Sequence, residues 1–437
     1  MSELLLVLFS GAYIIISWYR RDYALLMIAL LLPSYLIRFK IFSIPFTVLE
    51  VMILIIFLTW VITSLLYKSV DGSKIPLLKR SSFNWSLPVL LFIGAGIIAV
   101  MISPDTRQAL GLWKAYILEP ILLYLVFINT IKTNKQIKMI VFGLGISVVF
   151  ISVVTIWQYI GWIDIPGDYA FEIPKRATSV FPFPTAVGKF VGPLLGLFLG
   201  LLLVKSNESK QIQTGNDMLW RNIFLWGVVL FSIIALTLSF SRGALIGVFS
   251  AIFFISFFSK WKKWIFSGMA VVILLALLIP VTRNSITDVF NTSDTSTDVH
   301  LVMWKGAVRI IKDNPITGTG LASFPIVYDD YKEASHTEYF PNPDHLILSL
   351  WIEMGIAGLI IFSWIVILFF RSGIKLIKYD RKWAVALLAS VVVILVHGLM
   401  DTPYFKNDLS AMFWILIGLM VVICNKYEID DSSEKIR

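Results

Sequence analysis

Long apolar segments recur from one end of the chain to the other, and this repetition constrains the fold more than any other feature. A helix needs about 20 residues to cross a hydrocarbon core roughly 30 Å thick, and the chain offers segments near that length at 3–19, 23–37, 46–67, 86–103, 109–130, 137–162, 186–204, 223–241, 243–259, 264–281, 346–370, 383–400 and 409–424. Hydrophobic residues make up 58% of the 437 residues and charged residues only 15%, far from the composition of a soluble protein. The sequence therefore predicts an all-α polytopic bundle of about 12–13 transmembrane spans, a single membrane domain over residues 1–437. Twelve crossings result if residues 1–40 form one broken hairpin.

The basic residues are distributed unevenly between alternate connections. Most of the 37 lysines and arginines lie in one set, near residues 20–22, 68–80, 132–138, 205–221, 260–263, 371–382 and 425–437, and basic loops stay on the cytoplasmic side. The other side then holds the large loop 282–345 and all four histidines, His300, His336, His345 and His397. We therefore expect the functional site on the extracytoplasmic side. The net charge of +9 reflects membrane orientation, and we expect no nucleic-acid partner.

One helix is expected inside the large loop, where TDVHLVMWKGAVRIIKDNP begins at a Thr or Asp cap and is stopped by Asn314-Pro315. Its helical spacing predicts two faces, with Trp304, Val308 and Ile311 on one and Lys305, Arg309 and Lys312 on the other. The basic stripe either lies among lipid headgroups or steers a phosphate-bearing lipid toward the bundle. The GTG that follows supplies glycines for a turn.

The segment NPDHLILSLW reads as the start of a helix, with Asn342 as N-cap, Pro343 at the first position, Asp344 in the first turn and His345 at the third position. The helix dipole disfavours an imidazolium there, while Asp344 favours it, so His345 can be neutral and accept a proton near pH 7. His345 is therefore a candidate general base. The alternative is an amphipathic residue at the membrane interface.

Three further residues follow on the same predicted helix. Glu353 is rotated by about 80° from His345 in helical geometry, so it is a supporting residue with no direct contact. Gly355 and Gly358 predict a surface for close helix packing.

Two arginines stand in apolar surroundings at the extracytoplasmic edge. Arg242 lies in LTLSFSRGALIG between two predicted spans, and Arg176 precedes the proline-rich FPFPT that leads into another. An arginine at the membrane edge needs an anionic partner to offset its desolvation, which makes both residues candidates for binding an anion. Snorkelling to lipid headgroups is the alternative.

His397 and Asp401 are four residues apart at a predicted helix end and could share a metal ion. We favour an ion pair or hydrogen bond, because only two such ligands are adjacent. The sequence contains no Walker A run, HExxH, cysteine pair or outer-loop DxD, so neither a metal nor another cofactor is expected.

Taken together, these motifs resemble the O-antigen ligase and O-antigen polymerase family. NPDHLILSLWIEMGIAGL is similar to its histidine helix, in which the histidine stands ten residues before a glycine, as His345 does before Gly355. LTLSFSRGALIG resembles its serine-arginine motif, RATSVFPFPTAVGKFVGPLL its outer-loop arginine, and HLVMWKGAVRIIKDNPITGTGLASF the helix of its large loop. HGLMDTPYFKNDLSAMFWILIGL resembles its C-terminal end. The matches follow the family order over residues 85–425.

The resemblance implies a GT-C-like, metal-independent, inverting glycosyltransferase of the bacterial cytoplasmic membrane. Its donor would be a glycan on undecaprenyl diphosphate, and its acceptor a hydroxyl of a glycan, lipid or protein at the extracytoplasmic face. By the same resemblance, His345 is the base or orienting group, and Arg242 and Arg176 bind the diphosphate. Many relatives carry an arginine where this chain has His300, so either His300 substitutes for it or Lys305 and Arg309 take over.

The resemblance leaves ligase and polymerase open, and it names neither the sugar, the acceptor nor the oligomeric state. A secondary transporter of a phosphorylated lipid or solute is the alternative from another class. Transporters usually show internal repeats and polar breaks at the membrane midplane. Here the polar residues gather at one edge.

Overall fold

The computed structural model describes residues 3–41, 44–71, 83–205, 215–278, 295–332 and 340–434. His336 lies outside these ranges. The α-helices are α1 (Glu3–Tyr19), α2 (Arg21–Leu30), α3 (Val48–Asp71), α4 (Phe83–Ile102), α5 (Thr106–Trp113), α6 (Glu119–Thr130), α7 (Asn134–Tyr159), α8 (Pro184–Leu203), α9 (Gly215–Ser239), α10 (Arg242–Ser256), α11 (Lys262–Leu278), α13 (Thr295–Asp313), α14 (Phe324–Val327), α15 (Leu346–Leu376), α16 (Arg381–His397) and α17 (Asn407–Glu434). Shorter pieces are the 3₁₀ helices η1 (Leu32–Leu36), η4 (Gly167–Ala170) and η5 (Tyr328–Asp330) and the π-helical η3 (Lys114–Leu118). Strands β1 (Arg38–Ile41) and β2 (Ile44–Thr47) form an antiparallel hairpin. The predicted all-α class is confirmed.

Eight helices in the described part of the chain are long and apolar enough to cross a membrane: 48–66, 85–102, 106–130, 134–159, 184–203, 219–239, 346–376 and 407–427. Two shorter apolar helices, 4–19 and 242–256, accompany them. Each of the thirteen predicted spans coincides with helical structure. The protein is a multi-pass membrane protein.

The predicted span 23–37 is broken rather than continuous. Its helix α2 ends at Leu30, and η1 continues the chain with Pro33 in its first turn. Proline lacks the N–H that an α-helix needs in its interior, which explains the change of helix type. At about 1.5 Å per α-helical and 2.0 Å per 3₁₀ residue, α2 and η1 together rise roughly 25 Å.

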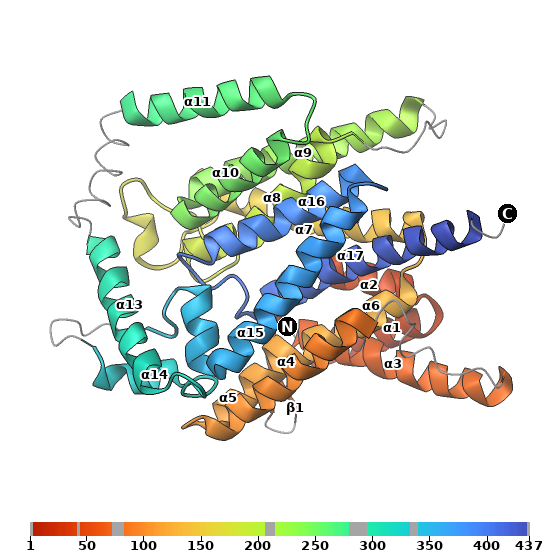
Figure 1. Ribbon diagram of the computed structural model, residues 1–437, viewed down its shortest axis with the longest axis horizontal. Helices are drawn as coiled ribbons and strands as arrows, with labels where there is room; N and C mark the ends of the chain where they lie inside the picture. Colours follow the sequence, from red (N-terminus) through yellow and green to blue (C-terminus); the bar gives the residue numbers. More distant parts are fainter. Residues whose placement is uncertain are drawn as a thin grey trace.

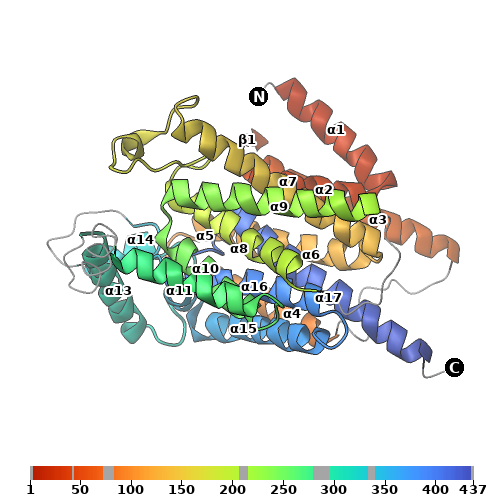
Figure 2. The same ribbon diagram turned by 90° about the horizontal axis from the view of Figure 1, so that it is seen from above.

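Helix α8 lies at the centre of the bundle, between α16, α9 and α10 (Figures 1 and 2). Its glycines recur every fourth residue at Gly188, Gly192, Gly196 and Gly200, along one face. A Cβ at Gly196 would press on the backbone of Ala389, and one at Gly200 on the backbone of Ala386. Small residues at this spacing let two helix backbones approach closely within a membrane, and they fix α16 against α8.

The large loop forms a small core of its own at one end of the bundle (Figure 1). Met303, Ala307 and Ile310 of α13 are buried there with Phe324 and Tyr328. The predicted apolar face of Trp304, Val308 and Ile311 is therefore wrong in part, because Val308 is 40% exposed and the buried stripe runs one residue earlier. The basic residues Lys305, Arg309 and Lys312 are exposed as predicted.

The loop docks into a break in α15 at Gly355. This glycine has φ 66°, and a Cβ there would collide with the backbone at Ile316 and Thr317. Thr319 N donates to Ile352 O at 2.7 Å, and Ile356 N donates to Ile316 O at 3.1 Å. Gly355 thus serves the docking of the loop, whereas the sequence predicted a surface for packing another helix.

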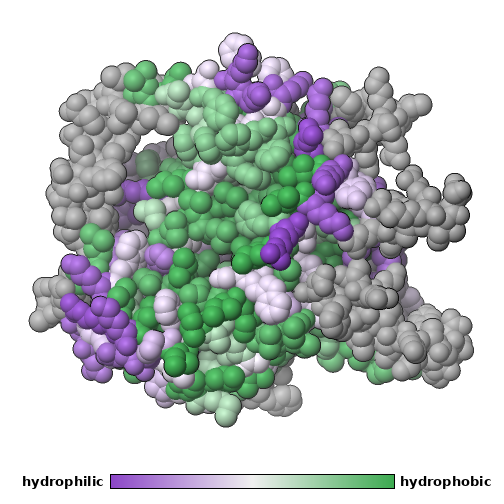
Figure 3. All heavy atoms as spheres, viewed as in Figure 1, coloured by the Kyte–Doolittle hydropathy of each residue, from purple (hydrophilic) through white to green (hydrophobic). Residues whose placement is uncertain are grey.

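Apolar residues cover most of the middle of the face seen in Figure 3. Hydrophilic residues gather at its lower left, where Figure 1 places α13 and α14, and also at the top and upper right. This distribution fits a bundle with an apolar belt between two polar ends. The large loop therefore lies at a polar end of the molecule.

Candidate functional site

His345 is the N-cap of α15. The helix begins at Leu346, and Nδ1 of His345 accepts a hydrogen bond from Leu348 N at 3.5 Å. The predicted N-cap, Asn342, instead accepts from Asp344 N at 2.9 Å and from the Thr402 hydroxyl at 3.2 Å. The prediction was wrong because Asn342 closes a turn with its own backbone, with Asp344 at φ 41°. The helix therefore starts three residues later than expected.

Contacts from two other elements hold this helix start in place. Leu346 N donates to Gly398 O, at the end of α16, at 2.7 Å. From α13, the Trp304 indole N–H donates to Pro343 O at 2.9 Å. The imidazole of His345 is thus positioned by α15, α16 and α13 together.

A row of three aromatic rings connects α13 with α15. His300 and Trp304 lie 6.0 Å apart between ring centroids, and Trp304 meets His345 edge-on at 5.3 Å. The exposed side chains of Lys305 and Arg309 follow on α13, where Arg309 donates to Tyr331 O at 3.4 Å. Three residues of α13 were predicted to bind the donor: His300, Lys305 and Arg309. Among them, His300 is the one connected to His345 by ring contacts, through Trp304.

The environment of His345 favours the neutral ring. Burial lowers the pKa of His345 below its usual 6.5, so the imidazole is uncharged at pH 7. While Nδ1 accepts from Leu348 N, the proton of the neutral ring sits on Nε2. In this tautomer Nε2 donates a hydrogen bond. To accept a proton at Nε2, the ring gives up its cap, which is long at 3.5 Å and therefore weak.

Asp401 belongs to a buried ion pair that the sequence did not reveal. Lys189 of α8 donates to Asp401 Oδ1 at 2.8 Å, and both side chains are 8% exposed. His397 Nε2 lies 3.9 Å from Asp401 Oδ2, which agrees with the predicted pairing of these two residues. The signal that could have found Lys189 is a lysine inside an otherwise apolar helix, because such a charge needs a partner.

The Asp344 carboxyl faces the same charges. Burial, and after it the charge of Asp401, raises the pKa of Asp344 to about 7, against the opposing charge of Lys189. A carboxyl in this range exchanges its proton near neutral pH. Asp344 is therefore a second group, next to His345 in the chain, that can hold or release a proton.

The start of α10 packs directly on these residues. A Cβ at Gly243 would collide with the His397 ring, and one at Gly188 with Ser241. Arg242 stands between Ser241 and Gly243 at the first position of α10, with an exposed side chain. Within the described residues, two buried polar atoms here lack a hydrogen-bond partner, Ser241 Oγ and His397 Nδ1. Close backbone packing thus brings Arg242 to the site.

Arg176 reaches the same junction from the loop before α8. Its Nε donates to Ser239 O at 3.3 Å, and its Nη1 lies 3.8 Å from Glu172 Oε2. Gln158 of α7 holds the following turn, because its Oε1 accepts from the backbone N–H groups of Thr178 and Ser179 at 2.9 and 2.7 Å. Arg176 and Arg242 therefore flank the junction of α9 (Gly215–Ser239) and α10.

A second, partly buried lysine lies beside this group. Lys406 Nζ stands 4.5 Å above the Phe181 ring and 4.9 Å from the Tyr35 ring, and burial lowers its pKa to about 8. Glu353 is different, because it lies about two turns further along α15, some 12 Å from the helix start. Its side chain is buried, and Oε2 has no hydrogen-bond partner among the described residues.

In the described ranges, no three His, Cys, Asp or Glu side chains come together as metal ligands. The charged groups that do come together are Lys189, Asp401 and Asp344, while Arg242 begins the helix whose Gly243 packs on His397, and Arg176 contacts Ser239 at the preceding helix end. Such a set can bind an anion and exchange a proton in one place.

Residues 227–363 match the family model of O-antigen ligase. This part of the chain is therefore similar to the O-antigen ligase family. A search of curated proteins finds no match. The matched region extends from α9 into α15 and includes Arg242, the large loop and His345, whereas Arg176, Lys189, His397 and Asp401 lie outside the matched residues. The O-antigen ligase family is enzymatic, and the similarity supports a glycan-transferring function at a membrane, with glycan and lipid partners in general.

Proposed function

We propose that this protein transfers a glycan from an undecaprenyl diphosphate carrier to a hydroxyl acceptor, at the extracytoplasmic face of the bacterial cytoplasmic membrane, with inversion and without a metal. The observation that carries the proposal is that Asp344, beside His345 in the chain, lies in the field of the buried Lys189–Asp401 pair, while the turn that bears Arg242 packs on His397, the neighbour of Asp401. Proton-exchanging groups and fixed cations are the two things that such a transfer needs.

The bonds that form and break in this transfer indicate the role of the two arginines. The acceptor oxygen attacks the anomeric carbon of the donor sugar from the face opposite to the carrier, and the bond from that carbon to the diphosphate oxygen breaks. The diphosphate leaves with the electron pair, so its charge increases in the transition state. Arg242 and Arg176 stabilise this charge, since a guanidinium grips two phosphate oxygens at once.

The acceptor proton passes to His345. The ring first shifts its proton to Nδ1 as the long Leu348 cap opens, and Nε2 then accepts the proton from the attacking hydroxyl. Asp344 is the alternative acceptor, supported by its raised pKa of about 7. The two assignments predict different pH profiles, because an Asp344 base gains activity as pH rises through about 7 and a His345 base reaches full activity at lower pH.

The test incubates purified protein with an undecaprenyl-diphosphate glycan, with and without a candidate lipid acceptor, and identifies the products by mass spectrometry. Longer glycans on the carrier indicate a polymerase, and glycan on the acceptor indicates a ligase. Activity that survives EDTA supports metal independence. Wild-type protein that forms no glycan product in detergent, yet moves a labelled lipid across vesicles, would overturn the proposal in favour of a secondary transporter.

A further inference from the structure

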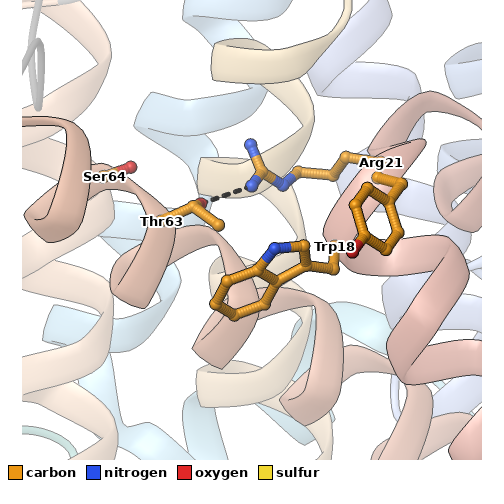
Figure 4. A pocket seen from close by; sticks show the side chains of 5 residues that line it. Trp18, Arg21, Thr63 and Ser64 are labelled. Carbon is orange, nitrogen blue, oxygen red and sulfur yellow. Dashed lines mark hydrogen bonds between the residues drawn. The ribbon is translucent and has the colours of Figure 1, made fainter.

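A cavity of about 350 Å³ lies between α1, α2 and α3, lined by Trp18, Tyr19, Arg21, Thr63 and Ser64. This volume falls within the roughly 300–1,000 Å³ of ligand pockets. Figure 4 shows the Trp18 indole below the guanidinium of Arg21, with Ser64 beyond Thr63. The cavity is polar at its centre and aromatic at its rim.

The cavity is remote from the candidate functional site. Glu50, near the start of α3, accepts a hydrogen bond from Asn407 at 2.8 Å, on the site's side of the bundle. Thr63 is thirteen residues further along α3, which places it about 20 Å away along the helix axis. The cavity therefore opens near the opposite membrane surface, the side on which the basic residues Arg20 and Arg21 are expected to stay.

Arg21 is held in position, yet its charge is not neutralised by a carboxylate of the described chain. Its Nη2 donates to Thr63 Oγ1 at 2.6 Å, and that hydroxyl donates onward to Thr59 O at 2.7 Å. Nε of Arg21 is buried without a hydrogen-bond partner among the residues that the structure describes. An oriented, partly desolvated guanidinium with a spare donor is suited to an anion.

The neighbouring Arg20, unlike Arg21, has its guanidinium paired with a carboxylate. Arg20 pairs with Asp22 at 3.4 Å and covers the Tyr23 ring at 4.2 Å, with 60% of its side chain exposed. Arg20 and Arg21 carry the same charge in adjacent positions. Only Arg21 points into the cavity.

The surroundings of the cavity fit a lipid. Trp18 is 39% and Tyr19 77% exposed, and these residue types concentrate at the level of lipid headgroups. Along α1, exposed apolar side chains continue from the cavity at Ile14 and Ile15 toward Leu8. Figure 2 shows α1 at one edge of the bundle, so this apolar side is available to acyl chains.

We propose that this cavity binds the phosphate of an anionic phospholipid from the leaflet opposite to the candidate functional site. Arg21 donates to the phosphate oxygens from Nε and its remaining N–H groups, while the Trp18 indole lies at the depth of the glycerol and the acyl chains run along α1. The site is independent of glycan transfer. It ties the first two helices to one leaflet.

The test measures lipid binding by native mass spectrometry of the full chain, with phosphatidylglycerol, zwitterionic phosphatidylcholine and inorganic phosphate as separate probes. Arg21→Gln is compared with Arg20→Gln, which removes the same charge one residue away. We expect Arg21→Gln to weaken phosphatidylglycerol binding at least about tenfold, the effect of losing a charge-assisted hydrogen bond, and Arg20→Gln to change it by less than about twofold.

Three results would overturn the proposal. Equal losses in the two variants would mean general surface electrostatics, and unchanged binding by Arg21→Gln would mean that the cavity is not the site. Competition by millimolar inorganic phosphate as strong as that by phosphatidylglycerol would identify free phosphate as the ligand. If Arg21→Gln does not fold, Arg21→Lys and Thr63→Val serve instead. Lysine carries its donors on a single nitrogen and lacks the planar fork of arginine, and valine releases the guanidinium, so each should weaken binding several-fold. Wild-type binding by both would refute the site.

Discussion

The bundle side and the loop side of the candidate site are held together by different forces. On the bundle side, Lys189 and Asp401 are buried and share a 2.8 Å ion pair. On the loop side, His345 meets Trp304 by ring contact and keeps a cap bond of 3.5 Å. Breaking the buried ion pair costs much free energy, because it leaves a charge unpaired. The long cap bond of His345 is weak, so the ring can change its hydrogen bonding at little cost in free energy. Under the proposed mechanism, the bundle side supplies fixed charges, and the loop side supplies the group that accepts the proton.

Replacing His345 is expected to have the largest effect on turnover. His345→Ala should reduce transfer by about 10²–10⁴-fold, the usual scale for a positioned acid or base. His345→Asn is the informative companion, because asparagine keeps an N-cap acceptor and cannot take the proton. Steady-state assays on folded, purified variants check both. Asparagine that restores wild-type turnover would reduce His345 to a helix cap.

Breaking the ion pair on the bundle side should act on stability. Lys189→Met leaves Asp401 buried and unpaired, so we expect the free energy of unfolding to fall by about 3–5 kcal/mol. Adding Asp401→Asn should recover part of that loss, whereas Lys305→Met, an exposed control, should stay within about 0.5 kcal/mol. Unfolding in detergent measures all three. A Lys189→Met protein as stable as wild type would contradict the distinction between the two sides.

The arginines at the junction should give an intermediate effect. Arg242→Lys and Arg176→Lys keep the charge but lose the planar fork, so we expect about tenfold weaker use of the donor, in turnover as well as in apparent affinity. Arg371→Lys, an exposed substitution on α15, is the control. If the two junction arginines only anchor lipid headgroups, lysine should be tolerated at Arg242 and Arg176 as well as at Arg371. Steady-state kinetics at varied donor concentration distinguishes this result from weaker use of the donor.

The last effect concerns the pH dependence of stability. Because the pKa of Asp344 is raised to about 7 in the folded protein and is about 3.9 when unfolded, the folded state binds the proton more tightly. Stability from this group is therefore present at low pH and is lost as pH rises from about 4 to about 7. Asp344→Asn should flatten that part of the profile and be the more stable form at pH 8. Thermal unfolding between pH 5 and 8 tests this, and parallel curves for the two proteins would rule it out.

Features set by local sequence could be predicted, whereas features set by contacts between distant segments could not. Apolar length alone located the helices, and NPDH, SRG and RATSV marked segments that the fold brings to one end. The partner of Asp401 could not be predicted, because Lys189 is 212 positions away and the choice depends on how closely the α8 glycines let α16 approach. The N-cap was misplaced for a similar reason. Asparagine is equally suited to an N-cap and to a turn. The hydrogen bond from Leu346 N to Gly398 O fixes the helix start at Leu346 and leaves Asn342 in the turn.

The break at Gly355 also determines which segment of this protein can be exchanged as a unit in a chimera. The first turns of α15, with His345 at their head, bond to the loop across the break through Thr319, Ile352 and Ile356. A chimera that swaps the loop alone would cut through this joint. We expect a graft to fold when the exchanged cassette runs from Thr295 to Ile356, so that the loop travels with the short helical segment that carries the histidine and with its partners across the break.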